Sequence, residues 1–456
     1  MEERRSEKVA ALKTAFVPTP TREYQTHREE LQRSRVRAFP GRRPTPLPLP
    51  VPAGGARVLI WKQDPTVPEL GIRKAYLPAR VFTGPRDARI SVKGISPVAP
   101  NTLGDFIQTL GSDSFDAVHT FTVVRQTLTL VQRALEGDPV PWQWNSPSNT
   151  DPLEVHPHGI PDTMNAFYSR TKRALKFGDF IKPGTSPAER IFTCRSLDIV
   201  SHEAGHAILD SFKPQWLLLG NPPQTGGLHE SFGDLTAIFI ALSQLDQVEA
   251  LIALTKGDLH DKSFLQDVAE EFGEALGRPN GLRNADNDLK LSEVSNEVHS
   301  ISQVFTGAVY DVMADLFDHE RNPSLRDDAA VLYEVGKYVW SLVLRAMKAA
   351  PNTTAVYADV ANAMLQITAD DGKPVEYRNA IRNRFALREV VTTPPSFALD
   401  IAEGMSLERV VHASDDAVQD RSMCCGTMNL TEYSQEGGEE QMLEAEIESF
   451  RAALEG

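Results

Sequence analysis

The segment Ser196–Phe212 constrains the fold most, because its chemistry depends on a single backbone conformation. It reads SLDIVSHEAGHAILDSF, with His202 and His206 four residues apart and Glu203 directly after the first histidine. Residues at i and i+4 lie on one face of an α-helix, so a helix here directs both imidazoles at one ion and sets Glu203 beside it. The segment therefore predicts a helix with half of a metal site.

A candidate for the third ligand follows in the segment GGLHESFGDLTAIF, residues 226–239. Glu230 lies 24 residues after His206 and opens a second apolar helix, with Asp234 one turn further on. A catalytic zinc ion takes three protein ligands and keeps one position open. Glu230 can supply the third ligand, while Asp234 orients one of the ligating imidazoles from behind. A solvated glutamate at a helix start is the alternative, but an unpaired charge among these apolar neighbours would be costly.

Composition and charge exclude several classes of protein. The chain has 456 residues, enough for two domains, and 41% of them are hydrophobic without any run near the roughly 20 residues of a membrane helix. The net charge of −15, from 47 basic and 62 acidic residues, disfavours binding to a phosphate backbone. We therefore expect neither a nucleic-acid nor a membrane partner, and the oligomeric state stays open.

The N-terminus and the cysteines bear on the compartment. The first residues, MEERRSEKVAALKTAF, lack the apolar core of a secretory signal, so a cytoplasmic location is the default and export by another route stays open. Cys194, Cys424 and Cys425 are an odd number with an adjacent pair. This pattern does not suit a disulfide framework, and all three are expected to be thiols.

The chain divides into four predicted parts. Residues 1–60 are a basic, proline-rich leader that we expect to be disordered, and residues 401–456 are an acidic tail. Residues 61–212 are predicted to form a mixed N-terminal lobe that ends in the helix with the two histidines. Residues 213–400 are predicted to form an all-helical C-terminal lobe, since apolar residues recur there with helical spacing.

Several helix boundaries can also be predicted. An amphipathic helix should begin at Asp113 and stop at Gly137. Further apolar stripes predict helices over 301–316 and 332–346. Ser186, in the stretch SPAER, has the pattern of an N-cap leading toward the helix with the two histidines.

Two further motifs, in the same order along the chain, extend the set. NEVHSISQVFTGAVYDVM contains His299 with Tyr310 eleven residues later, and DTMNAFYS contains Asn165 and Ala166. Together with HExxH and the downstream Glu-x-x-x-Asp, they resemble the thermolysin-like metallopeptidases of the gluzincin group. The resemblance covers roughly residues 162–316 and implies an α+β fold of two lobes, the mixed one with the HExxH helix and the helical one.

The resemblance also implies a zinc-dependent peptidase with a peptide or protein substrate. One zinc ion per chain would be held by His202, His206 and Glu230 and would activate a water molecule. Glu203 would take the proton of that water and pass it to the leaving amine.

The other two motifs imply roles in substrate binding and catalysis. His299 would stabilise the developing oxyanion as a hydrogen-bond donor. Asn165 and the Ala166 backbone would hold an extended peptide as an added strand.

The chain departs from the family pattern near the second histidine and the glutamate ligand. Leu217 replaces a tyrosine that supplies a second oxyanion donor, and a residue near Trp216 would have to compensate. His229 replaces an asparagine and can orient His206 in the same way, although a surface histidine beside a helix start is the alternative.

Two more departures concern carboxylates. Val294 replaces the acidic residue that orients the family's active-site histidine, which leaves Glu293 or Glu297 to orient His299. Asp198 matches a calcium ligand of the family, but its partner position is Ala241, so we expect no calcium.

Three functions remain after these comparisons. A zinc endopeptidase is favoured. An aminopeptidase is a near alternative, but the chain lacks the Gly-x-Met-Glu-Asn stretch that captures an amino terminus. A catalytically weak binding protein that keeps zinc for its fold is compatible with Leu217, whereas Glu203 argues against it, because a structural site needs no base beside the metal.

Overall fold

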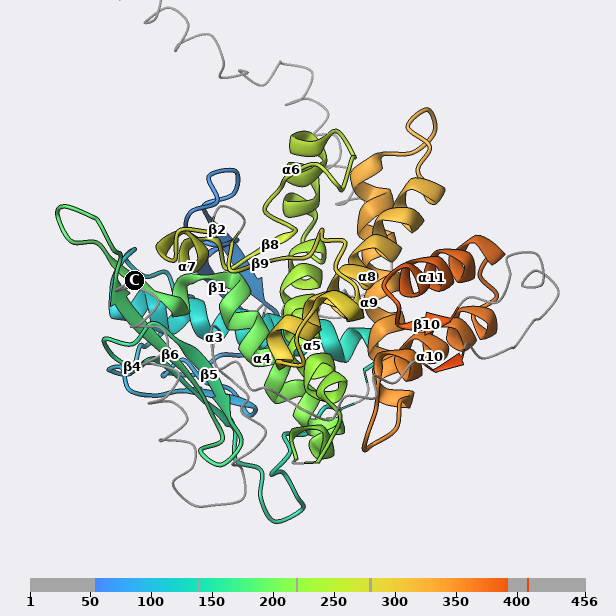
Figure 1. The fold of residues 1–456 in the computed structure, drawn as a ribbon. Helices are drawn as coiled ribbons and strands as arrows, with labels where there is room; N and C mark the ends of the chain where they lie inside the picture. Colours follow the sequence, from blue (N-terminus) through green and yellow to red (C-terminus); the bar gives the residue numbers. More distant parts are fainter. Residues whose placement is uncertain (1–53, 138, 219, 279–280, 393–407, 410–456) are drawn as a thin grey trace, which may run out of the picture. The chain divides into compact units, whose positions relative to one another are not determined.

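The computed structural model of the protein describes residues 54–392, except 138, 219, 279 and 280, together with residues 408–409. Residues 1–53 of the predicted leader and nearly all of the predicted acidic tail lie outside these residues. The prediction that the leader is disordered up to residue 60 is wrong at its end, because residues 56–60 pair with residues 73–77 as part of a strand. The described part is a mixed structure of helices and sheets (Figure 1). Its strands are β1 (Ala56–Trp61), β2 (Ile72–Leu77), β3 (Ile90–Val92), β4 (Leu153–Ile160), β5 (Ala166–Ser169), β6 (Ala174–Ile181), β7 (Arg190–Phe192), β8 (Asp267–Val268), β9 (Arg283–Asn284), β10 (Val391–Thr392) and β11 (Glu408–Arg409).

The helices dominate the second half of the described chain. The lobe predicted to be all-helical over residues 213–400 also contains the short strands β8, β9 and β10, so it is mainly but not wholly helical. The α-helices are α3 (Asp113–Ala134), α4 (Leu197–Phe212), α5 (Pro223–Leu242), α6 (Leu245–Thr255), α7 (Glu270–Ala275), α8 (Val298–Glu320), α9 (Asp328–Ala349), α10 (Tyr357–Asp370) and α11 (Val375–Leu387). The short 3-10 helices are η1 (Thr193–Arg195), η2 (Pro214–Leu217) and η3 (Leu291–Glu293). The helices predicted over 301–316 and 332–346 are confirmed as parts of α8 and α9.

A five-stranded mixed sheet precedes the helix with the two histidines. Its strands run in the order β3-β4-β6-β5, with β7 also paired to β6. β3, β4 and β6 are parallel neighbours, whereas β5 and β7 run antiparallel to β6. In the described chain β5 pairs with β6 alone, so one of its sides is a free edge of the sheet.

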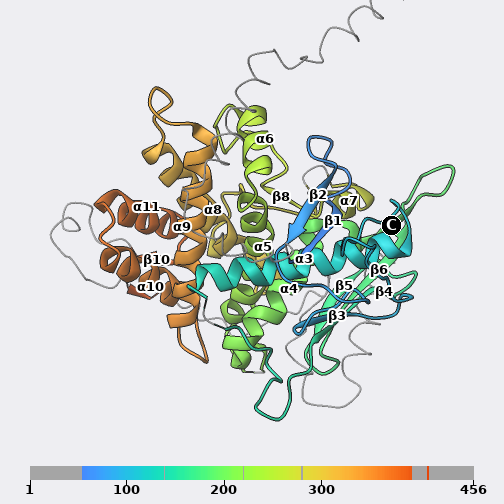
Figure 2. The same cartoon turned by 180° about the vertical axis from the view of Figure 1, so that it is seen from behind.

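The helix α3 packs against the sheet and against α4. The Ser112 hydroxyl caps its first turn by accepting from the Phe115 N–H at 3.1 Å, and Gly137, with φ of 91°, donates to the Gln132 carbonyl at 2.7 Å beyond its end. The predicted start at Asp113 is therefore confirmed, as is the stop at the glycine. Figure 2 shows α3 crossing this side of the structure beside β1 and β2.

The predicted N-cap at Ser186 is wrong. Ser186 lies in the turn between β6 and β7, and β7 pairs with β6 before the helix can begin. α4 starts later, where the Ser196 hydroxyl accepts from the Ile199 N–H. Strand pairing at long range thus overrides a local capping pattern.

The helix α5 is the centre of the helical part. Every residue from Gln224 to Leu242 is buried, and α5 packs against α4, α8 and α9. Its apolar composition follows from this burial on all sides. No described helix is by itself long and apolar enough to cross a bilayer, and only α5 and α6 taken together, with a bend of 91°, reach that length and composition.

Two glycines let α4 and α5 approach closely. A Cβ on Gly205 of α4 would lie 2.9 Å from the Thr236 hydroxyl and 3.3 Å from Gly233 Cα. A Cβ on Gly233 of α5 would lie 2.6 Å from two atoms of the His202 ring. Such distances are shorter than van der Waals contact, so the backbones can come this close only without side chains at the two positions.

We therefore predict that Gly233→Ala destabilises the protein by about 1–3 kcal/mol, because the added methyl group displaces the His202 ring in a packed core. Gly336→Ala is the matched control, since that helical glycine would place its Cβ 3.3 Å from Cβ and Cδ1 of Leu242, farther than the 2.6 Å contact at Gly233. This control should cost less, because the contact is looser and alanine favours the helix. Denaturant unfolding of both variants measures the difference, and equal midpoints would show that the glycine contact is not tight.

Candidate functional site

The helix α4 carries both histidines and Glu203 in the protein interior. His202, Glu203 and His206 are all buried, because α4 packs against α3, α5 and β5. The two imidazoles meet edge to face, and their Nε2 atoms lie 2.9 Å apart. The helix therefore presents two ligand nitrogens at one point.

Glu230 on α5 faces these two nitrogens. Its Oε2 lies 3.5 Å from His202 Nε2, and its Oε1 lies 3.6 Å from His206 Nε2. The ligand atoms of the three residues all lie within 4.8 Å of one another. A zinc ion bonded at about 2.0 Å would set two ligand nitrogens about 3.3 Å apart, so the group could hold such an ion with small shifts.

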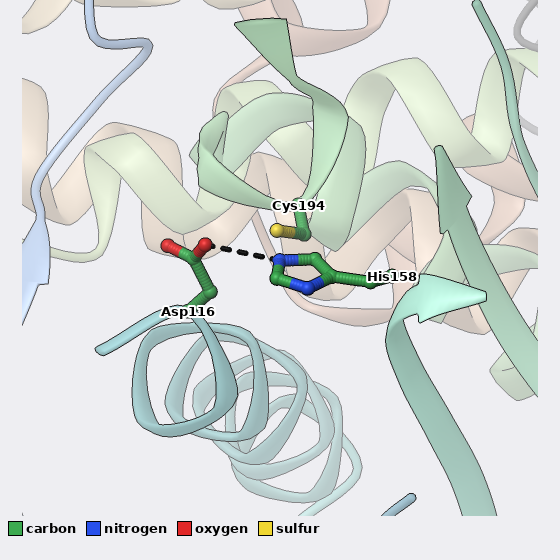
Figure 3. Close-up of side chains that lie close together, drawn as sticks. All are labelled: Asp116, His158 and Cys194. Carbon is green, nitrogen blue, oxygen red and sulfur yellow. Dashed lines mark hydrogen bonds and ion pairs between the residues drawn. The ribbon is translucent and has the colours of Figure 1, made fainter. Parts of the chain in front are cut away.

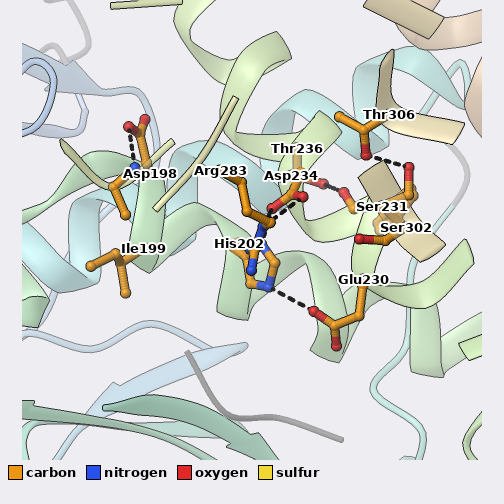
Figure 4. Close-up of polar contacts among 12 residues, drawn as sticks. Asp198, Ile199, His202, Glu230, Ser231, Asp234, Thr236, Arg283, Ser302 and Thr306 are labelled. Atoms are coloured by element: carbon orange, nitrogen blue, oxygen red, sulfur yellow. Dashed lines mark hydrogen bonds and ion pairs between the residues drawn. The ribbon is translucent and has the colours of Figure 1, made fainter. Parts of the chain in front are cut away.

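Asp234 contacts the Nδ1 atom of His202, and Arg283 in turn pairs with Asp234. Asp234 Oδ1 lies 3.0 Å from His202 Nδ1, the contact that its predicted orienting role requires. Arg283 on β9 pairs with the same carboxylate through Nη2 at 2.6 Å and Nε at 3.0 Å (Figure 4). Burial lowers the pKa of His202, but Asp234 and Glu230 outweigh it and raise this pKa to about 9. Arg283 lies 49 residues from Asp234 and belongs to no recognised motif, so the sequence carries no signal for this contact.

His229 supports His206 in a comparable way. The two Nδ1 atoms lie 2.7 Å apart, and the rings stack with centroids 4.9 Å apart. Burial lowers the pKa of His229 to about 3 and that of His206 well below its usual value, so both rings are neutral at pH 7. When His206 Nε2 binds a metal, its proton must sit on Nδ1 and be donated to His229 Nδ1. The surface alternative for His229 does not hold, because this side chain is buried.

Glu203 lies on the side of α4 that faces the edge strand β5. The Tyr168 backbone N–H on β5 donates a hydrogen bond to its carboxylate. Burial nevertheless raises the pKa of Glu203 to about 8. A divalent cation nearby would lower this pKa, because it favours the charged carboxylate.

His299 reaches the same group from the start of α8. Its Nε2 lies 3.2 Å from Glu230 Oε2, and its Nδ1 contacts the Glu297 carboxylate. Of the two carboxylates considered from the sequence, Glu297 therefore orients His299. Glu293 instead accepts from the Lys290 N–H at 3.1 Å, at the start of η3.

Asn165 and Ala166 lie where the edge strand begins. Both residues are buried, and the Asn165 Oδ1 accepts a hydrogen bond from the Ala166 N–H at 2.7 Å. The strand that they open, β5, packs against α4 next to Glu203. Their role in binding a substrate stays a prediction.

The described side chains around the replaced tyrosine make their contacts away from the group. Leu217 is buried in η2, and the Trp216 indole N–H donates to the Pro351 carbonyl at 3.0 Å. Tyr310, eleven residues beyond His299, donates its hydroxyl to the Leu259 carbonyl at 2.6 Å. His299 is therefore the donor that the predicted oxyanion role depends on.

Asp198 has surroundings that the sequence did not indicate. It lies buried beside Asp64, in the loop between β1 and β2, and beside Glu270 of α7. Burial raises the pKa of all three carboxyl groups. Ser196, not Asp198, caps α4. The expectation that calcium is absent depended on Ala241, and it stays a prediction.

Comparisons with known proteins give limited information. No known protein family matches the sequence, and no curated protein matches it. Among solved structures, 21 chains match, and one is the precursor of protealysin, a metalloproteinase from Serratia proteamaculans. That match has a TM-score of 0.42 and 15% sequence identity, over 62% of this chain and 80% of that chain. A likeness this distant leaves the function to be argued from the residues of the site.

We predict that Glu230→Ala lowers the zinc bound by the purified protein by one equivalent per chain, because two histidines alone hold the ion too weakly. Glu293→Ala, a carboxylate outside the group, is the control and should keep the full metal content. Metal analysis after dialysis decides the matter. Full occupancy in Glu230→Ala would remove Glu230 from the ligands.

We also predict that His229→Leu weakens zinc binding by roughly 10- to 100-fold, the usual effect of losing a partner that orients a ligand. His229→Asn should retain most of the affinity, because its amide oxygen can accept the His206 Nδ1 proton. Competition with a chelator measures both affinities. Equal losses in the two variants would mean that His229 acts through packing and not through this hydrogen bond.

Proposed function

We propose that the protein is a zinc-dependent peptidase that hydrolyses peptide bonds, and that it acts as an endopeptidase. The observation that carries the proposal is the convergence of two histidines, Glu230 and a buried carboxylate, Glu203, beside the free edge of a strand. A purely structural zinc site has no use for such a carboxylate next to an edge strand.

The donor set fits zinc. Two imidazole nitrogens and one carboxylate oxygen make up a common ligand set of catalytic zinc sites. The Glu230 oxygens face imidazole nitrogens of His202, His206 and His299 at 3.2–3.6 Å. Asp234 and His229 orient the two histidines that would bind, as outer partners of metal ligands commonly do.

The residues of the site have different roles in the proposed reaction. When bound, zinc supplies a Lewis acid that polarises a carbonyl and acidifies water. Glu203 accepts a proton from the attacking water and returns it to the leaving amine. The low-dielectric surroundings that raise the pKa of Glu203 also make it a stronger base once it is ionised.

His299 stabilises negative charge on the substrate oxygen. Its Nδ1 contacts the Glu297 carboxylate. Burial raises the pKa of Glu297, but the contacts with His299 outweigh burial and bring this pKa below its usual value, so Glu297 is ionised. Because Nδ1–H donates its hydrogen bond to Glu297, the ring can act as a donor to the substrate only when Nε2 also carries a proton. The proposed role therefore requires the doubly protonated ring, which would lie between the carboxylates of Glu297 and Glu230.

A peptide in extended conformation fits the free edge of β5. Such a segment would pair with β5 through backbone hydrogen bonds, as in other cases of strand addition, and its scissile bond would lie toward α4. Asn165 and Ala166 would hold its start. The same interpretation assigns a thermolysin-like arrangement, with the mixed lobe over residues 61–212 and the helical lobe over 213–400.

A catalytically weak, zinc-stabilised binding protein is the second candidate. One observation favours this candidate. Leu217 has no donor group and the Trp216 indole donates to Pro351, so His299 is the side chain assigned here as a donor to the oxyanion. Loss of one oxyanion donor typically costs about 10²- to 10³-fold in rate. The residual rate still exceeds that of an inert binding module.

We predict that Glu203→Gln keeps its zinc and its thermal midpoint but loses at least about 10²-fold in kcat on a fluorogenic peptide, because an amide cannot accept the proton. His299→Ala should lose about 10²- to 10³-fold. Zinc content and unfolding of each variant serve as controls. Unchanged turnover by a metal-loaded Glu203→Gln protein would exclude Glu203 as the base, and a wild-type protein without activity on any peptide would favour the binding module.

A further inference from the structure

Three side chains with metal-binding atoms converge at a second place in the fold. Asp116 lies in the first turn of α3, His158 on β4 and Cys194 on η1, and their ligand atoms all lie within 4.8 Å of one another. Figure 3 shows the carboxylate, the imidazole and the thiol turned toward a common point. The three residues are 42 and 36 positions apart along the chain, so only the tertiary structure brings them together.

The group is held rigidly by its neighbours. His158 Nε2 lies 3.1 Å from Asp116 Oδ2. Arg195 pairs with both oxygens of Asp116, through Nε at 2.8 Å and Nη2 at 2.9 Å. The Phe192 ring covers the group, with its centroid 5.1 Å from that of His158 and 4.1 Å from Arg195 Cζ. Asp116 and Cys194 are fully buried, while the His158 side chain is 20% exposed, so the group lies just beneath the surface.

We propose that Asp116, His158 and Cys194 form a second metal site, which holds a divalent ion with affinity for sulfur, such as zinc. One thiolate, one imidazole and one carboxylate are each established zinc ligands, and a water molecule can take the fourth position on the exposed side. Bonds of about 2.0–2.3 Å place tetrahedral ligand atoms about 3.3–3.6 Å apart, so a small side-chain rotation closes the site.

Each proton of this binding step has a destination. The Cys194 thiol releases its proton to solvent. The ring proton of His158, which lies on Nε2 where that atom faces the Asp116 carboxylate, moves to Nδ1 so that Nε2 can bind the ion. The thiolate and the Asp116 carboxylate then carry two negative charges against the two positive charges of the ion and the one of Arg195, so the site has a net charge of +1, with Arg195 still paired to the carboxylate as an outer partner. Burial raises the pKa of the Cys194 thiol, so the thiol stays protonated until a metal displaces the proton.

A network of ion pairs is the competing explanation for the same geometry. Asp116, His158 and Arg195 satisfy one another without any metal, and the Cys194 thiol makes a hydrogen bond with the Thr120 side chain. That network does not by itself require the thiol to lie within reach of the carboxylate and the imidazole, as it does. An ion at this place would join α3, β4 and η1, directly before the start of α4 and eight residues before His202. The ion would therefore stabilise the position of the helix that carries the proposed catalytic centre. This second metal site does not depend on that centre being active.

Cobalt provides the test, because a thiolate ligand adds a charge-transfer absorption in the near ultraviolet that nitrogen and oxygen ligands lack. The background is the full chain with Cys424→Ser and Cys425→Ser, which leaves Cys194 as the single cysteine. We expect two cobalt ions per chain and the thiolate band. Adding Cys194→Ala should remove the band and one equivalent of cobalt.

Two further variants keep the test decisive. Glu230→Ala should lose one equivalent of cobalt and retain the band, which separates this site from the proposed catalytic one. His158→Gln changes a partly exposed side chain, so it should fold even where Cys194→Ala does not, and it should weaken cobalt binding in the band titration at least 10-fold. A folded background protein that binds one equivalent without the band, or a band that is unchanged in His158→Gln, would overturn the proposal.

Discussion

The close contact between α4 and α5 is the constraint on which the rest of the site depends. Gly205 and Gly233 remove the side chains that would separate the two helices. Only then can the imidazoles of α4 and the carboxylate of Glu230 on α5 lie within reach of one ion. The burial of α5 by α4, α8 and α9 fixes the distance, since a packed core resists displacement.

This contact places several charges in the protein interior, and each of them has a partner. Asp234 lies between His202 and Arg283, and Glu297 contacts His299. Buried charges are costly unless they are paired in this way, and the pairs also fix the orientation of each imidazole. The same pairs set the protonation of the His202 ring, so the contacts that stabilise the site are also the ones on which the proposed metal binding and proton transfer depend.

The sheet contributes an edge and a scaffold. In the described chain β5 pairs on one side only and packs against the helix that bears Glu203, which places an unpaired strand edge beside a buried carboxylate. The strand β4 of the same sheet, together with α3 and η1, forms the cluster of Asp116, His158 and Cys194. The strand edge beside Glu203 and this cluster both follow from one packing arrangement, in which the sheet, α3 and α4 contact one another.

The sequence by itself determined the features that depend on local periodicity and capping. The i, i+4 spacing of His202 and His206 and the apolar stripes of α8 and α9 are set by the helical repeat, and the start of α3 is set by a cap. The local pattern at Ser186 failed, because pairing of β7 with β6 outweighs a capping preference. The tertiary structure alone decided that Arg283 backs Asp234, that Glu297 and not Glu293 orients His299, and that Cys194 meets Asp116 and His158. Two of these contacts join residues that are far apart in the sequence, and the third selects one of two nearby carboxylates. The sequence carries no local signal for these contacts, because the burial and pairing of charges that stabilise them depend on the tertiary structure.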